Sequence, residues 1–500
     1  MIQRISTAAE YHRATSYRRQ RLPGHTLDWM HSPSATKPYP PLKRVPLERD
    51  HRLPEIDFFE RAGRGPTGDQ RSANLLDRHR LSKLFRLTHD MTARRMQGGD
   101  AFYLRSVASA GALYPFELYL AAHRIDGLDP GVYHHGLFDF SLTVLRSDPL
   151  AIIPPTQVGV AATVYIAGIF FRSAWKYRGR AYRYVLLDAG HLLENLHLAL
   201  DALNFSFSIH LDFDDSRAAA LLGLDARQEV CLACVHLYDG SNVRGRTEDA
   251  GGPAPLRAEI LKASTVSDRV VVYPEILAVH RAGNRVFARS AEDAPDTDLF
   301  ADRPTAWIDL DPPATYPRAD YVQVLRQRRS RRNFVAAPVS LDRFTIFMDR
   351  IAQRKELRPA MPRSCRLAVT CGFLVGEKMP IPPGFYVLDA CARRLGVLKA
   401  GHLTASMAAA CLDQMWLKQA ALHMLLLTDL AALDRAWGAR GYRYALIEAG
   451  RLGQQAYLAA TAVGWGACGI GAVYDREAAD LLGLKEAALL YLVGIGPVKA

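Results

Sequence analysis

The stretch Tyr182-Arg183-Tyr184-Val185-Leu186-Leu187-Asp188-Ala189-Gly190 occurs twice in this chain of 500 residues. It returns, with conservative changes, as Tyr442-Arg443-Tyr444-Ala445-Leu446-Ile447-Glu448-Ala449-Gly450. The segment 221–224 likewise returns at 481–484, so both repeats have an offset of 260, and 18 of the 59 residues aligned by this offset are identical. Self-similarity at one fixed offset indicates a tandem duplication. Two copies of one fold in one chain are expected to pack as an intramolecular pseudo-dimer.

Apolar patterns predict the main elements of each copy. Runs at 116–122, 162–169 and 230–238 predict strands, and residues 184–203 predict a long helix. Apolar residues at helical spacing also predict a helix within 72–96. From these patterns and the Gly- and Pro-rich stretches between them we expect an N-terminal arm over 1–50, a first domain over 51–240, a connector over 241–317 and a second domain over 318–500.

The composition is that of a globular protein, with 49% hydrophobic and 23% charged residues. The formal net charge of +12 arises mostly in the first hundred residues, as at Arg18-Arg19-Gln20-Arg21. The basic residues are not interleaved with aromatic residues as in a platform for single-stranded nucleic acid, so we expect no nucleic-acid partner and consider an acidic peptide at least as suitable. No apolar run approaches the roughly 18 residues of a membrane helix, and the N-terminus lacks a secretory signal. We therefore expect a cytoplasmic protein without a membrane partner.

The seven cysteines are scattered and do not form a disulfide framework. Cys231 and Cys234 have a C-x-x-C spacing, but they lie in a predicted strand. Residues three apart on a strand point to opposite faces, which makes them poor joint metal ligands. We expect no metal site.

The two copies have diverged in complementary ways. The second copy contains Arg328-Arg329-Ser330-Arg331-Arg332-Asn333-Phe334 at the end of a predicted helix. Several arginines around a hydroxyl group suit a phosphate, because charge-assisted and bidentate hydrogen bonds are strong. The matching region of the first copy, near Asp69-Gln70-Arg71-Ser72, is much weaker. Taken alone, the arginine cluster is equally compatible with a surface patch.

Two stretches of small residues show the same complementarity. The second copy has Gly466-Ala467-Cys468-Gly469-Ile470-Gly471-Ala472, where the first has the bulkier Ser206-Phe207-Ser208-Ile209-His210-Leu211-Asp212. The first copy has Ser109-Ala110-Gly111-Ala112-Leu113-Tyr114-Pro115, where the second has Ser364-Cys365-Arg366-Leu367-Ala368-Val369-Thr370. Small residues allow backbone N–H groups to approach a flat or anionic ligand. Each stretch is also compatible with an ordinary turn.

The segment Trp175-Lys176-Tyr177-Arg178 is a third asymmetry, because the offset of 260 places Ala436 and Trp437 opposite Lys176 and Tyr177. The structural interpretation is an interfacial lysine beside a packed tyrosine. The functional interpretation is acid–base catalysis, with either a lysine of lowered pKa or the tyrosine taking a substrate proton.

The loop 109–115, with Arg105-Ser106-Val107-Ala108 before it, and the Lys176–Tyr177 pair resemble the SagB/ThcOx-type azoline dehydrogenases of the nitroreductase superfamily. The resemblance implies an α+β, tandem duplicated nitroreductase-like fold with FMN between the two halves. In that family one subunit supplies the Arg-x-Ser-x-Arg contacts to the phosphate and a small loop near flavin N5, and its partner supplies the serine loop over the ring.

Transferred to this chain, the resemblance implies one intact site and one that has lost its parts. The second half would bind FMN through Arg328, Ser330, Arg332, Gly471 and Ala472. The first half would add Ser109, Ala110, Gly111 and Leu113, with Lys176 and Tyr177 as the catalytic residues.

The implied reaction is the FMN-dependent oxidation of thiazoline or oxazoline rings to azoles in a ribosomally made, modified peptide. The implied partners are the modified precursor peptide and a cyclodehydratase complex, with the chain a monomeric pseudo-dimer or a homodimer. Two alternatives remain open: a general NAD(P)H-dependent nitroreductase or flavin reductase, and a degenerate scaffold that binds a precursor peptide without flavin.

Overall fold

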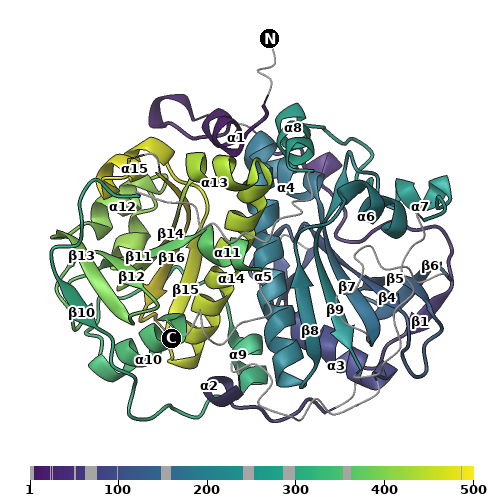
Figure 1. Ribbon diagram of the computed structural model, residues 1–500, viewed down its shortest axis with the longest axis horizontal. Helices are drawn as coiled ribbons and strands as arrows, with labels where there is room; N and C mark the ends of the chain where they lie inside the picture. Colours follow the sequence, from purple (N-terminus) through teal and green to yellow (C-terminus); the bar gives the residue numbers. More distant parts are fainter. Residues whose placement is uncertain are drawn as a thin grey trace.

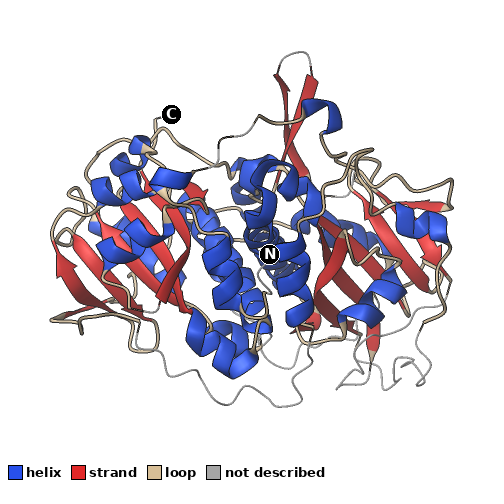
Figure 2. Cartoon of the chain, turned by 90° about the horizontal axis from the view of Figure 1, so that it is seen from above, coloured by secondary structure: helices blue, strands red, loops and turns tan. Residues whose placement is uncertain are grey.

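The computed structural model describes residues 5–22, 24, 26–49, 52–61, 76–97, 100–147, 159–239, 253–284, 299–352, 362–485 and 487–499. They form two similar halves that lie side by side, each built on a seven-stranded sheet (Figure 1). Seen from above, helices occupy the space between the two sheets (Figure 2). The expected α+β duplication is confirmed.

The two sheets have the same topology. The strand order of the first is β1-β6-β5-β4-β7-β9-β8, and that of the second is β10-β13-β12-β11-β14-β16-β15. The first sheet consists of β1 (Arg44–Pro46), β4 (Phe116–Ala122), β5 (Gly131–Gly136), β6 (Ser141–Arg146), β7 (Val160–Ile169), β8 (Ser206–His210) and β9 (Glu229–Tyr238). The second consists of β10 (Trp307–Asp309), β11 (Thr370–Val375), β12 (Gly384–Asp389), β13 (Arg394–Ala400), β14 (Leu422–Asp429), β15 (Gly466–Ile470) and β16 (Ala487–Gly496).

The helices also correspond between the halves, most clearly α4 with α13, α5 with α14 and α6 with α15. Those before the second sheet are α1 (Ala8–Ala14), α2 (Phe58–Arg61), α3 (Arg78–Thr88), α4 (Phe170–Tyr177), α5 (Ala181–Ala202), α6 (Asp215–Leu222), α7 (Ala258–Lys262) and α8 (Pro274–Ala282). The others are α9 (Tyr321–Gln327), α10 (Leu341–Ala352), α11 (Arg363–Leu367), α12 (Thr404–Ala410), α13 (Leu430–Trp437), α14 (Arg440–Ala462) and α15 (Asp475–Leu482).

The N-terminal arm and the connector contribute equivalent pieces to the two halves. Strand β1 of the arm pairs with β6, and β10 of the connector pairs with β13, so each sheet gains an edge strand. Helices α1 and α8 also correspond. His12 on α1 is hydrogen-bonded to Tyr442 (3.0 Å), and His280 on α8 to Tyr182 (3.1 Å). Since Tyr182 and Tyr442 are repeat partners, the duplication extends into both segments.

The region 72–96 differs from the sequence prediction. Helix α3 begins after Asp77, whose carboxylate accepts the N–H of Arg80, and ends at Thr88. Residues Met91–Gln97 are strand β2, which pairs with β3 (Asp100–Arg105) in a separate hairpin that stands out from the body (Figure 2). Met91 lies four residues after Leu87, which is a helical interval, but it begins strand β2 and does not continue the helix.

The two long helices α5 and α14 pack against each other between the sheets (Figure 1). They approach closest at Gly190 and Gly450, which are repeat partners. A Cβ atom added to Gly190 would lie 2.9 Å from the Cα of Gly450, and one added to Gly450 would lie 3.0 Å from the Cα of Gly190. Each would also collide with a backbone carbonyl of the other helix. The interface is therefore isologous, as expected for a pseudo-two-fold axis.

Reciprocal ion pairs hold the ends of these helices to the opposite half. Arg183 of α5 is 2.7 Å from Asp475 of the second half, and its repeat partner Arg443 is 2.7 Å from Asp215 of the first. All four side chains are nearly excluded from solvent. Removing one member of such a pair would leave the other charge buried and uncompensated, so each pair depends on this packing of the halves.

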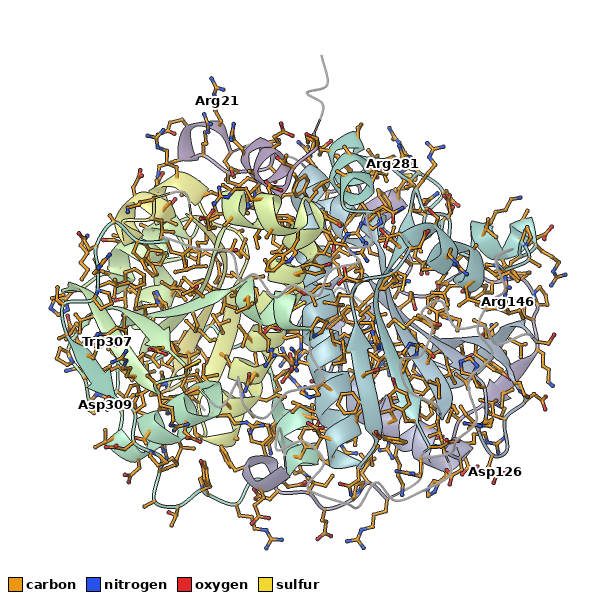
Figure 3. All side chains as sticks on the ribbon, viewed as in Figure 1. Arg21, Asp126, Arg146, Arg281, Trp307 and Asp309 are labelled. Atoms are coloured by element: carbon orange, nitrogen blue, oxygen red, sulfur yellow. The ribbon has the colours of Figure 1, made fainter. Side chains whose placement is uncertain are left out.

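Within the described residues, no helix is long and apolar enough to cross a membrane. Part of the surplus positive charge lies at the periphery, where Arg21 and Arg281 point outward (Figure 3). Arg19 of the basic arm binds Asp413 and Glu477 of the second half at 2.7 and 2.8 Å. The arm is thereby attached across the interface.

We predict that Gly190→Ala lowers the free energy of unfolding by about 1–3 kcal/mol, because the added methyl group must push the two helices apart. Chemical denaturation measures the change. The matched control is Gly24→Ala, since a Cβ atom at Gly24 meets nothing within 4 Å. Equal stability of the two variants would contradict the close helix contact.

Candidate active site

The loop that follows β3 is held in place by a buried carboxylate on α5. Ser109 donates its hydroxyl to Asp188 (2.5 Å), and the backbone N–H of Ala110 donates to the same carboxylate (3.1 Å). The hydroxyl of Ser109 also accepts the N–H of Tyr114 (2.8 Å). Gly111 then takes φ +63°, which favours glycine, and its exposed backbone forms the tip of the loop. Burial raises the pKa of Asp188 to about 7.

Lys176 and Tyr177, at the end of α4, lie directly against this loop. A Cβ atom added to Gly111 would lie 2.8 Å from the hydroxyl of Tyr177 and 3.3 Å from Nζ of Lys176. Burial, followed by the positive charge of Arg332, lowers the pKa of Lys176. Burial and the neighbouring Tyr184 raise the pKa of Tyr177. The lowered pKa makes Lys176 the better proton acceptor of the two candidate bases. The raised pKa of Tyr177 keeps its hydroxyl protonated, as a hydrogen-bond donor.

The arginine cluster begins where α9 ends at Gln327. Arg328 is only 3% exposed and donates to the backbone carbonyls of Arg105 (2.9 Å) and Ser106 (2.9 Å) in the first half. Part of its hydrogen-bonding capacity therefore joins the two halves at the root of the Ser109 loop. This role was not expected from the sequence, which predicted only phosphate contacts.

Ser330 and Arg332 complete the cluster. The hydroxyl of Ser330 is 3.0 Å from that of Tyr457 on α14, which also accepts the N–H of Gly469. The guanidinium of Arg332 is exposed, lies 6.0 Å from the ring of Trp416 and is close enough to Lys176 to affect its pKa. The charge of a second-half residue thus acts on a catalytic candidate of the first half.

The small loop after β15 meets the same region from the second half. The backbone carbonyl of Gly471 accepts from Arg180 (3.1 Å) and Tyr184 (3.4 Å). A Cβ atom on Gly471 would lie 2.6 Å from the ring of Tyr184, so a larger residue cannot be accommodated there without movement. Tyr184 in turn packs on Tyr177, with 4.4 Å between ring centroids. Ala472 follows, half-buried, as is Leu113 in the first-half loop.

The structure therefore brings the predicted residues of both halves to one interface. Sequence reasoning missed Asp188, which orients the serine loop, and Tyr457, which contacts Ser330. Asp188 was detectable, since it lies inside the repeated stretch and is replaced there by Glu448.

In the described residues, the pseudo-symmetric position carries larger side chains that are packed or paired with one another. Trp437 occupies the place of Tyr177 and packs on Tyr444, with 5.7 Å between ring centroids. Arg451 replaces His191 and forms buried ion pairs with Glu448 (2.9 Å) and Glu194 (2.9 Å). The corresponding first-half segment near Asp69-Gln70-Arg71-Ser72 lies outside the described residues.

The residues present fit an anionic, planar cofactor. In the described part of the chain, neither Arg328 nor Arg332 has a carboxylate within ion-pair distance, and burial lowers the pKa of Arg328. A buried cation without a counter-charge is costly, and a phosphate group would supply one. Gly111 and Gly471 present no side chain of their own to a ring, and the side chains of Tyr177 and Tyr184 pack against them.

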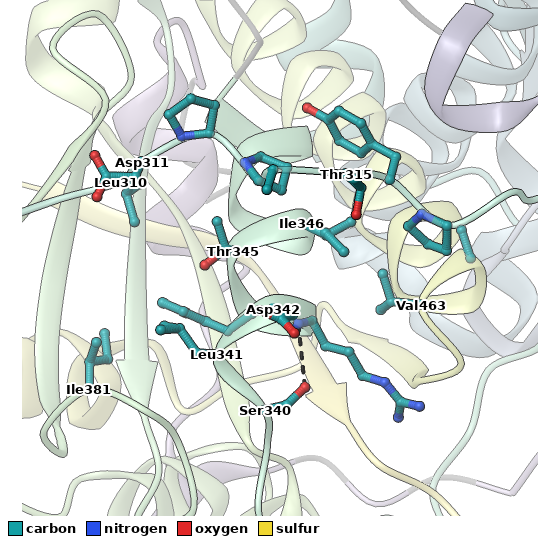
Figure 4. A pocket seen from close by; sticks show the side chains of 18 of the residues that line it. Leu310, Asp311, Thr315, Ser340, Leu341, Asp342, Thr345, Ile346, Ile381 and Val463 are labelled. Atoms are coloured by element: carbon teal, nitrogen blue, oxygen red, sulfur yellow. Dashed lines mark hydrogen bonds between the residues drawn. The ribbon is translucent and has the colours of Figure 1, made fainter.

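A cavity outside this interface is lined by none of these residues. It has a volume of about 1000 Å³ and lies in the second half, between the connector segment Ile308–Pro317 and α10 (Figure 4). Its wall is made of apolar side chains such as Leu310 and Ile346, with Asp311 and Asp342 among the polar ones. It brings no acid–base pair together, and we assign it no catalytic role.

Comparison with known proteins gives the family. The nitroreductase family profile matches residues 72–237 and 325–497, which together exceed half of the chain. The chain belongs to the nitroreductase family. A crystal structure of an Anabaena variabilis protein described as a nitroreductase aligns with 99% of this nitroreductase-family chain and 100% of its own, with a TM-score of 0.76 and 22% identity. The shared fold thus covers both halves.

Two curated relatives match parts of this nitroreductase-family chain. MJ1384 of Methanocaldococcus jannaschii, described as a nitroreductase, is 35% identical over 94 residues, which are 19% of this chain and 46% of the relative. The trifolitoxin-processing protein TfxB of Rhizobium leguminosarum is 29% identical over 149 residues, which are 27% of this chain and 40% of the relative. Each match spans less than half of the relative's own length.

We predict a pH-dependent effect for Asp188→Asn. The folded protein raises the pKa of this carboxyl to about 7, so the unfolded chain binds its proton less tightly and wild-type stability falls as pH rises from about 4 to about 7. Asparagine does not titrate. The stability of the variant relative to wild type should therefore increase by about 1.4 kcal/mol per pH unit across that window.

Denaturation at several pH values measures this difference. The exposed Asp342→Asn is the control and should show no such trend. A constant difference between wild type and Asp188→Asn from pH 4 to pH 8 would contradict the buried carboxyl.

Proposed function

We propose that this chain is an FMN-dependent dehydrogenase that oxidises thiazoline or oxazoline rings to azoles in a ribosomally made, modified peptide. The observation that carries the proposal is the position of Lys176 and Tyr177 against Gly111, in the half that owns the serine loop, with Arg332 of the other half beside them. The partial similarity to a trifolitoxin-processing protein supports a role in processing a natural product.

FMN would be held by residues of both halves. Arg328, Ser330 and Arg332 would bind its phosphate, and Gly471 with Ala472 would border the ring. Ser109, Ala110, Gly111 and Leu113 would cover the ring from the first half. When bound, FMN supplies a two-electron acceptor for hydride.

The chain's own contribution to the chemistry is a proton acceptor on the substrate side. Conversion of an azoline to an azole removes a hydride and a proton from adjacent carbons. Neutral Lys176 would take the proton at Nζ, which its lowered pKa makes accessible. Tyr177, with a raised pKa, would keep its proton and donate a hydrogen bond to the substrate ring.

The proposal includes a cytoplasmic location, a modified precursor peptide as substrate and a cyclodehydratase complex as partner. The runner-up is a general NAD(P)H-dependent nitroreductase, which the 35% identity to a protein described as a nitroreductase favours. Broad NADPH oxidation with small nitroaromatic acceptors, without azoline turnover, would select that alternative.

We predict that Lys176→Ala reduces azoline oxidation by about 10²–10⁴-fold, because a general base contributes that much. Tyr177→Phe should reduce it less. FMN content and thermal stability should remain near wild type in both. Lys399→Ala, at an exposed position of β13, is the control for loss of a lysine.

Full azoline-oxidising activity in Lys176→Ala would show that the pair is structural. Loss of flavin together with activity would lead to the same conclusion.

Arg332→Ala should weaken FMN binding by about tenfold to a hundredfold, since a charge-assisted hydrogen bond is worth about 1.5–3 kcal/mol. Arg331→Ala is the adjacent control, because the backbone N–H of Arg331, and not its charge, is bound to Ala467 (2.9 Å). Fluorescence titration of the apoprotein with FMN measures both. Equal losses in the two variants would mean that the phosphate lies elsewhere.

A further inference from the structure

Another cavity lies in the first half, and none of the flavin-site candidates lines it. It has a volume of about 260 Å³ and lies between β4–β6 and the arm segment 35–39. Its wall includes six side chains used below: Lys37, Arg105, Glu117, His134, His135 and Phe138. None of these was assigned a role by the sequence analysis or by the proposed reaction.

Most charges around this cavity are already paired. Glu117 binds Arg172 (2.6 Å) and His134 (2.8 Å). Lys37 is buried and bound to Glu229 (2.5 Å). Each of these two carboxylates and each of their cations therefore already has a partner of opposite charge.

Arg105 is the exception. It is 4% exposed and, among the described residues, has no carboxylate within ion-pair distance. One of its terminal nitrogens is 3.3 Å from His89, its Nε has no hydrogen-bond partner in the described chain, and its guanidinium lies 4.2 Å from the ring of Tyr114. Burial lowers its pKa to about 10. Both ring nitrogens of the neighbouring His135 likewise have no partner there.

The second half has uncharged residues at several positions that correspond to the charged residues around this cavity. Glu117 of β4 pairs with Ala167, whose repeat partner is Leu427. Leu427 pairs with Thr370 of β11, one position before the Cys371–Leu426 pair, so Thr370 is the counterpart of Glu117. The register of β5 and β12 places Val387 and Leu388 at the positions of His134 and His135, and the offset of 260 places Ala432 at that of Arg172. The counterpart of Arg105 lies outside the described residues. Burying charge is expensive, and replacing buried ionic groups by apolar ones is often neutral or stabilising. The polar side chains of Glu117, His134 and Arg172 thus have no equivalent charge in the second half, and their retention in the first points to binding.

We propose that this cavity binds a small organic carboxylate. Its carboxylate would face Arg105, whose fork of N–H donors suits that group, and its apolar part would lie on Phe138. The ring centroid of Phe138 is 5.7 Å from the guanidinium, and both side chains line the cavity. The volume is at the lower end for ligand pockets, so the ligand is small.

Binding of a ligand to Arg105 would affect the loop that contains Ser109. The carbonyl of Arg105 accepts from Arg328 (2.9 Å), and its N–H donates to the hydroxyl of Tyr114 (3.3 Å). The N–H of Tyr114 is in turn bound to the hydroxyl of Ser109 (2.8 Å). A ligand that orders Arg105 thus acts on both sides of the proposed flavin site.

The test is calorimetric titration of the full chain, as purified, with benzoate. We expect saturable binding of one benzoate per chain, weakened by about tenfold to a hundredfold in Arg105→Met, which keeps the length of the stem and removes the charge. Ala35→Trp should weaken it similarly, because the exposed Ala35 lines the cavity and a large ring would fill its mouth. If Arg105→Met does not fold, Ala35→Trp decides. Lys176→Ala should bind benzoate as wild type does.

Three results would overturn the proposal. They are no saturable benzoate binding to wild type, affinities unchanged in both cavity variants, and a loss of binding in Lys176→Ala, which would place benzoate at the flavin site. Tighter binding of inorganic phosphate than of benzoate would overturn the assignment to a carboxylate. The reaction proposed above can fail without affecting any of these measurements.

Discussion

The contact between α5 and α14 is the constraint on which the rest of the structure depends. Two glycines that are repeat partners, Gly190 and Gly450, allow the helix backbones to touch, and no larger residue fits at either position. Buried reciprocal ion pairs, such as Arg183 with Asp475, then fix the rotation of one half against the other. The ends of α4, α9 and β15 meet at one interface only because this packing places them there.

A symmetric interface creates two equivalent positions, but in this chain the residues at the two positions differ. At one, Lys176 and the open Gly111 loop of the first half face Arg332 of the second. At the other, Trp437 and the buried pairs of Arg451 fill the space. Duplication inside one chain permits this, because each copy can change without changing its partner. The same freedom allows charged residues of the first half, such as Glu117 and Arg172, to have uncharged counterparts, Thr370 and Ala432, in the second.

Much of this arrangement could be predicted from the sequence, because internal repetition reports a pseudo-dimer without knowledge of any contact. The sequence also predicts a single composite site, because Ala436 stands opposite Lys176 and the arginine cluster of Arg332 is much weaker in the first copy; this site stays a prediction. Features that depend on three-dimensional packing could not be predicted. Arg328 was expected to bind phosphate alone, yet it also joins the halves through two backbone carbonyls. The correspondence of arm and connector was hidden because short edge strands and single helices leave little sequence pattern.

The most direct test of the central claim is the number of flavins bound by one chain. Purified protein would be saturated with FMN, freed of excess ligand and assayed for flavin by absorbance against protein concentration. A single composite site predicts one FMN per chain. Two FMN per chain would mean that the position filled by Trp437 and Arg451 also binds cofactor, and none after reconstitution would mean that the interface is not a flavin site; either result contradicts the account.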